Sequence, residues 1–286
     1  MTILPADIKM GAVTLRVANL DAMTKYYSDV LGLKVLSEGI DSRVLGGSSG
    51  SALILEHAPE LKHASPSDAG LFHTAFLYES REALATAVFA LASNYPQSLT
   101  GSADHLVSEA FYFDDPEGNG VELYFDKERT SWSWQHGQIQ MDTLQLDPNA
   151  YLRDNLKEPR VSEDPVIGHV HLSVGNIEQA KEFYVNQLGF EVTMNWGGTA
   201  LFVSAGGYHH HMAMNIWRSR GAGVRQQTLG LGDVSILLPD SDSFGSALER
   251  ITSKGKEAVL VSESAASFED PWGNQVSLSW DEASAR

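Results

Sequence analysis

The sequence predicts an α+β protein in which four βαβββ modules form two tandem domains. A repeat pairs the first half of the 286-residue chain with the second half, and a strand–helix–strand pattern recurs again within each half. Such self-similarity indicates that one structural unit has been duplicated. The predicted domains cover residues 8–126 and 166–281, and residues 127–165 connect them.

The repeat between the halves has a constant offset of 157 residues. Gly, Val, Leu, Val and Asn recur at matching places in residues 11–20 and 168–177, and Tyr27 matches Tyr184. Each segment alternates at period two and then shows an amphipathic helical pattern that closes with Gly after Leu. Each segment therefore predicts a strand, a helix and a further strand.

A second repeat, at an offset of 155 residues, pairs residues 113–119 with residues 268–274. Both contain the motif Asp-Pro-x-Gly-Asn. Pro, Gly, Asp and Asn are the residues that tight turns favour, so each copy predicts a turn between two strands.

Each half divides again into two modules. In the first half these are residues 8–57 and residues 70–126, the latter with a helix over 81–92. In the second half they are residues 166–217 and 228–281.

The composition excludes several classes of protein. Apolar residues make up 43% and charged residues 20%, which is typical of a globular chain. Cysteine is absent, so a bound metal must be held by nitrogen and oxygen. The net charge of −17 argues against a nucleic-acid surface, which needs clustered Lys and Arg.

Several sequence signatures are missing. The chain contains no GxxxxGK[ST], which disfavours a nucleotide-dependent enzyme. No apolar run approaches the roughly 18 residues of a membrane span. The first residues do not follow the pattern of a secretion signal. We therefore expect a cytoplasmic protein that binds neither membrane nor nucleic acid.

The four-module plan and the Asp-Pro-x-Gly-Asn endings resemble the vicinal oxygen chelate superfamily. Within it, the chain is similar to extradiol ring-cleaving dioxygenases of the catechol 2,3-dioxygenase type. The resemblance implies tandem vicinal-oxygen-chelate-type domains whose mixed sheets curl into metal-binding cups. It also implies a small aromatic diol as the substrate and a homo-oligomeric protein.

Superfamily members ligate their metal from the first strand of a module and from the strand after the turn motif. The resemblance therefore selects His73, Glu122 and His169 as metal ligands, from modules two and three. The corresponding positions of modules one and four hold no such set, although Asp233 and Ser277 occupy two of them.

Two imidazoles and one carboxylate are the ligands of the 2-His-1-carboxylate site, which suits Fe(II) and leaves three positions open. These positions can take a diol together with O₂ as co-substrate. Mn(II) is the alternative metal. His171 lies on the same strand face as His169 by alternation and is the second choice for this ligand.

Three further residues match catalytic positions of extradiol enzymes. Tyr112 lies ten residues before Glu122, and His105 lies a few residues upstream of Tyr112. Residues 208–214 resemble the strand that carries the acid–base histidine, which selects His210. On a strand, His210 faces away from His209 and His211.

The ligands come from both halves of the chain, whereas common catechol dioxygenases take theirs from the C-terminal half. We expect module two to pair with module three in one sheet and module one with module four. A site at a subunit interface is the alternative. A non-redox metalloenzyme of the glyoxalase or epimerase type also remains open, as does a metal-free binding protein of the antibiotic-sequestering kind.

Overall fold

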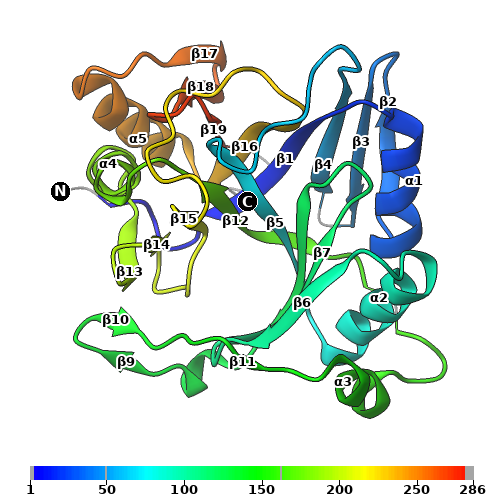
Figure 1. Cartoon of the computed structure of the whole chain (residues 1–286). Coiled ribbons are helices and arrows are strands. Elements are labelled where there is room, and N and C mark those ends of the chain that lie inside the picture. Colours follow the sequence, from blue (N-terminus) through cyan, green and yellow to red (C-terminus); the bar gives the residue numbers. More distant parts are fainter. Residues whose placement is uncertain (1–2, 49, 162, 281–286) are drawn as a thin grey trace. The chain divides into compact units, whose positions relative to one another are not determined.

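The computed structural model describes residues 3–48, 50–161 and 163–280. Its helices and strands follow one another as four βαβββ modules, coloured from blue to red along the chain in Figure 1. This confirms the predicted α+β class and the four-module plan. None of the helices in the described part of the chain is both long and apolar enough to cross a bilayer.

The first two modules have regular elements throughout. Module one consists of β1 (Lys9–Val17), α1 (Leu20–Leu31), β2 (Lys34–Glu38), β3 (Ser42–Gly47) and β4 (Gly50–His57). Module two consists of β5 (Gly70–Tyr78), α2 (Arg81–Asn94), β6 (Leu99–Asp104), β7 (Ser108–Asp114) and β8 (Gly120–Asp126).

In the last two modules the plan recurs, with one irregular helix. Module three consists of β12 (Val166–Ser173), α4 (Ile177–Lys181), the π-helical segment η2 (Glu182–Gln187), β13 (Glu191–Trp196), β14 (Ala200–Ser204) and β15 (Met212–Asn215). Module four consists of β16 (Gly230–Leu238), α5 (Ser241–Ser253), β17 (Val259–Ser262), β18 (Ala265–Glu269) and β19 (Gln275–Trp280).

The described part of the connector between the second and third modules has regular elements of its own. It contains the 3₁₀ turn η1 (Arg129–Ser131), a hairpin of β9 (Trp134–Gln135) and β10 (Gln138–Ile139), the short strand β11 (Leu144–Gln145) and helix α3 (Pro148–Asn155). Strand β11 pairs antiparallel with β6, with Leu144 opposite Asp104.

The strands form two large mixed sheets. One has the order β17-β18-β19-β16-β1-β4-β3-β2 and combines modules four and one. The other has the order β11-β6-β7-β8-β5-β12-β15-β14-β13 and combines modules two and three. In modules two, three and four the first strand runs parallel to the last. The expected pairing of module two with module three is therefore confirmed.

The chain groups into two compact units, which we describe separately. Unit 1 consists of Met1–Thr14, Lys62–Phe72 and His169–Arg286, and unit 2 consists of Leu15–Leu61 and His73–Gly168. The division passes within β1, β5 and β12, so each unit takes segments from both sequence halves. The domain limits expected from the sequence stay a prediction.

The residues that recur between the halves close the helices. Asn19 and Asn176 cap α1 and α4, and each side chain accepts a backbone N–H of the first turn. Gly32 and Gly189 follow the helical segments with φ of 72° and 100°, a left-handed conformation that glycine adopts without strain.

The recurring turn is organised by a buried aspartate. Asp115 Oδ1 accepts the backbone N–H groups of Glu117 and Asn119, and Oδ2 accepts the Tyr27 hydroxyl of α1 at 2.8 Å. In the other half, Asp270 accepts the Tyr184 hydroxyl at 3.0 Å. The repeated tyrosines and aspartates are therefore hydrogen-bond partners that tie each turn to a helix.

We expect Tyr27→Phe to destabilise the protein by about 1.5–3 kcal/mol, because it removes a hydrogen bond to a buried charged group. The matched control is Tyr26→Phe. Tyr26 is equally buried, and its hydroxyl has no hydrogen-bond partner. Urea unfolding monitored by circular dichroism measures both variants. Equal free energies of unfolding for the two variants would show that the bond to Asp115 contributes nothing.

Burial raises the pKa of Asp115 to about 6, against the effect of its hydrogen bonds. The folded protein then binds this proton more tightly than the unfolded chain, so the contribution of Asp115 to stability falls as the pH rises from about 4 to about 6. The variant Asp115→Asn has no titrating carboxyl group at this position, so it serves as the reference.

Relative to this variant, the free energy of unfolding of the wild type should fall by about 1.4 kcal/mol between about pH 5 and about pH 8. Urea titrations of both proteins at these pH values measure it, and Asp270 contributes equally to both. A difference that is constant or rises with pH contradicts the expectation.

Candidate metal site

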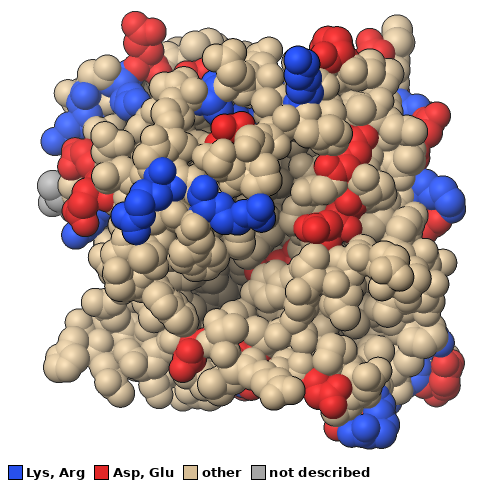
Figure 2. Space-filling view, in the orientation of Figure 1, with Lys and Arg blue, Asp and Glu red and all other residues tan. Residues whose placement is uncertain are grey.

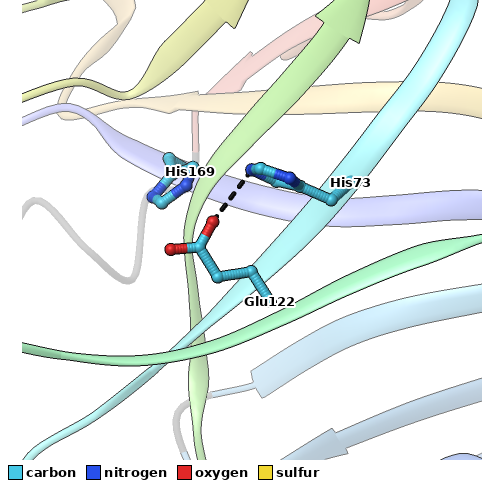
Figure 3. A group of neighbouring side chains, drawn as sticks. All are labelled: His73, Glu122 and His169. Carbon is cyan, nitrogen blue, oxygen red and sulfur yellow. Dashed lines mark ion pairs between the residues drawn. The ribbon is translucent and has the colours of Figure 1, made fainter. Parts of the chain in front are cut away.

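His73 and Glu122 form a buried pair in unit 2. They lie on the parallel strands β5 and β8, where Glu122 is opposite Ala75. His73 is two residues before Ala75 and therefore shares its strand face. His73 Nε2 and Glu122 Oε2 are 2.9 Å apart (Figure 3), and the two residues are 6% and 2% exposed.

Tyr112 extends this pair on the neighbouring strand. In the β7–β8 hairpin Tyr112 is directly opposite Glu122, which explains the ten-residue spacing between them. Burial and the carboxylate of Glu122 raise the pKa of Tyr112 well above its usual value. The phenol therefore keeps its proton at neutral pH.

His105 forms a hydrogen bond with the Tyr112 hydroxyl. Its Nε2 is 2.6 Å from Tyr112 Oη, and its Nδ1 is 2.7 Å from the backbone oxygen of Asp142 in the connector. A carbonyl oxygen can only accept, so Nδ1 carries a proton. In the neutral ring Nε2 is then the acceptor, and Tyr112 donates its proton to it.

His169 lies on β12 in unit 1 and is 2% exposed. Its ring centroid is 4.0 Å from that of His210 and 5.9 Å from that of His209. Parallel pairing of β12 with β15 explains this proximity, because the N–H of Val170 donates to the carbonyl of His211 at 3.1 Å.

The glycine before His169 also has a packing role. A Cβ at Gly168 would lie 1.7 Å from the hydroxyl oxygen of Tyr124 in unit 2. No larger residue fits here unless Tyr124 moves.

In the described part of the chain, one group of side chains could hold a metal ion. It consists of His73, Glu122 and His169. One ligand atom from each lies within 4.8 Å of the others, and all three residues are buried. Two imidazoles and a carboxylate fit Fe(II), which takes this donor set with open positions for substrate. That these residues bind a metal stays a prediction.

The second-choice ligand, His171, has a different partner. Asn215 Oδ1 accepts the N–H of Trp217, so the amide nitrogen of Asn215 is the atom that faces His171 Nε2 at 3.0 Å. This nitrogen of His171 therefore accepts a hydrogen bond. Nothing in the sequence pattern had singled out Asn215.

The expectation that residues 209–211 lie on a strand is wrong. β15 begins at Met212, and the three histidines occupy the bend before it. Alternation of faces does not apply in a bend, and the Nδ1 atoms of His209 and His210 are 2.7 Å apart. All three histidines are buried, so they form no surface patch. His209 is thus a neighbour of His210 that the sequence pattern misplaced.

Modules one and four have different chemistry at the matching positions. Asp233 on β16 accepts the hydroxyl of Ser277 on β19 at 2.8 Å.

The acidic and basic side chains on the face drawn in Figure 2 lie in small groups among uncharged residues.

Comparisons with known proteins agree with this architecture. Residues 9–123 and 166–278 each match the family model of the Glyoxalase/Bleomycin resistance protein/Dioxygenase superfamily. The chain is 34% identical to the catechol-2,3-dioxygenase of Bacillus subtilis (strain 168) over 278 residues, which are 95% of this chain and 96% of that protein.

Solved structures share the fold at lower identity. A protein from Bacillus subtilis described as a dioxygenase candidate has a TM-score of 0.69 and 16% identity, over 98% of this chain and 87% of that one. Glyoxalase I from Zea mays has a TM-score of 0.60 and 18% identity, over 97% and 94% of the two chains. Both halves match the family model, and a relative with 34% identity aligns with nearly the whole chain. The chain therefore belongs to the glyoxalase/bleomycin resistance protein/dioxygenase superfamily.

Proposed function

We propose that the protein is an extradiol dioxygenase, which cleaves a catechol-type ring next to its two hydroxyls and inserts both atoms of O₂. The observation that carries this proposal is the buried donor set of His73, Glu122 and His169. The resemblance to a catechol-2,3-dioxygenase supports a small aromatic diol as the substrate.

The proposed cofactor is Fe(II), with Mn(II) as the alternative. His73, His169 and Glu122 would hold it, and the bound metal would supply chelation of the diol and activation of O₂. The carboxylate of Glu122 would offset part of the metal's charge within the buried site. Glyoxalases usually hold their metal with four protein ligands, two of which are carboxylates. The present group has three ligands and one carboxylate, so it does not match that pattern.

Tyr112 and His105 would act on the diol. Tyr112 keeps its proton, which His105 Nε2 accepts in this structure. When a diol binds, the phenol would redirect this hydrogen bond from His105 to a diol oxygen. His210 would serve as general acid and base, since an imidazole gains and loses a proton near neutral pH.

The homo-oligomeric state and the cytoplasmic location stay predictions. The discriminating experiment is oxygen uptake by the iron-loaded protein with catechol, together with formation of the coloured ring-opened product. Metal binding without oxygen uptake, combined with isomerisation of a glutathione hemithioacetal, would instead favour the glyoxalase type.

Substitution of any proposed ligand should remove the metal. His73→Ala, Glu122→Ala and His169→Ala each delete one of three donors, so we expect loss of bound iron and of oxygen uptake together. Asp233→Ala is the matched control, because it changes the equivalent first-strand position of module four and should retain iron. Elemental analysis of the purified proteins measures the iron content.

His171→Phe tests the competing ligand. Full iron occupancy in this variant is expected, since Nε2 of His171 accepts from Asn215. Loss of iron here, with iron retained in His169→Ala, would move the ligand to His171.

Tyr112→Phe should retain the metal and lower kcat by about 10²–10³, the usual effect of removing one hydrogen-bond donor at a reacting oxygen. Tyr78→Phe is the control, because Tyr78 is also buried on this sheet and its hydroxyl has no hydrogen-bond partner. Steady-state oxygen uptake measures both variants. Equal activity of the two variants would remove Tyr112 from the reaction.

A further inference from the structure

We infer that His209 is a positioning residue that fixes the ring orientation of His210 through Nδ1 and couples the tautomers of the two rings, so that His210 acts through Nε2. The inference rests on the proposed function, in which His210 is the acid–base group. The observation behind it is the 2.7 Å contact between the Nδ1 atoms of the two rings.

His209 is held firmly enough to serve as an anchor. It is 0% exposed, and its carbonyl accepts the hydroxyl of Thr193 at 2.6 Å. The ring of Tyr208 lies against its ring with centroids 4.1 Å apart. The carbonyl of Tyr208 in turn accepts the hydroxyl of Ser204 at 2.6 Å. The bend is therefore fixed on both sides of the His209 backbone.

Hydrogen-bond chemistry links the two rings. A neutral imidazole carries one N–H and one acceptor nitrogen, and two nitrogens at 2.7 Å need one proton between them. If Nδ1 of His209 donates, neutral His210 carries its own proton on Nε2. If Nδ1 of His210 donates, Nε2 of His210 is the acceptor. In either arrangement Nδ1 of His210 is engaged with His209, and the state of one ring determines that of the other.

The position of His210 makes this link relevant to the site. Its ring lies 4.0 Å, centroid to centroid, from His169 and 5.0 Å from Phe202. A ring anchored through Nδ1 presents the opposite nitrogen, Nε2, in a fixed direction. Without the anchor, the His210 ring would populate further rotamers, and a smaller fraction of molecules would have the working nitrogen in place.

A direct test uses the metal-free wild-type protein with ¹⁵N-labelled histidine. A hydrogen bond between two nitrogens transmits a scalar coupling, so we expect a coupling between the Nδ1 resonances of His209 and His210. These resonances are assigned from the spectra of His209→Asn and His210→Asn. Absence of this coupling overturns the inference, and the measurement needs neither iron nor activity.

Variants supply the functional test. His209→Leu removes the anchor, and we expect kcat to fall by about 10–100-fold with little change in KM for catechol, since orientation rather than binding is lost. His209→Asn places an amide near the former Nδ1 and should restore most of kcat. His211→Leu is the matched control: it changes the next buried histidine, whose Nδ1 accepts the N–H of Ala205 at 3.3 Å.

The outcomes separate the two proposals. Equal losses of kcat in His209→Leu and His209→Asn, or an equal loss in His211→Leu, would overturn the positioning role. If His209→Leu does not fold, the nitrogen–nitrogen coupling in the wild type decides. No oxygen uptake by iron-loaded wild type with any catechol would defeat the proposed dioxygenase function, while the coupling would still report on the link between the rings.

Discussion

The buried carboxylate of Asp115 is the constraint on which the position of Glu122 depends. Its two oxygens close the turn between β7 and β8 and fix the strand register that places Tyr112 opposite Glu122. The same carboxylate accepts the Tyr27 hydroxyl, which ties the hairpin to α1. A slip of one residue in this register would turn Glu122 to the other face of the sheet. The position of Glu122 as a candidate ligand therefore rests on a group outside the candidate metal site.

The bond between tyrosine and aspartate is duplicated, but the polar side chains on the strands next to it are not. Asp270 and Tyr184 repeat the same bond in the second half of the chain. Yet β19, the strand after this turn, carries Ser277, which bonds to Asp233 on the neighbouring strand β16. The turn thus specifies where a side chain on the last strand lies, and the residue type alone decides what it can do there.

Much of this was predictable because the signals are local or repeated. The strand–helix–strand order, the glycines that close the helices and the turn at Asp115 depend on residues within a few positions of one another. The candidate ligands were selected by the family resemblance, which assigns them to particular places in the repeat, and they stay a prediction. The bend before β15 was mistaken for a strand, since consecutive histidines carry no periodic signal. The bond from Asn215 to His171 was not foreseeable either, because it depends on the pairing of strands distant in sequence.

The connector contains a strand of only two residues, β11, yet this strand occupies the outer side of β6 at one end of the nine-stranded sheet. An exposed edge offers unpaired backbone groups to any other extended chain, and such edges are where proteins aggregate or exchange strands. By pairing with β6, the connector covers part of that edge. A segment that joins two halves of the chain thus also protects the protein against unwanted association at high concentration.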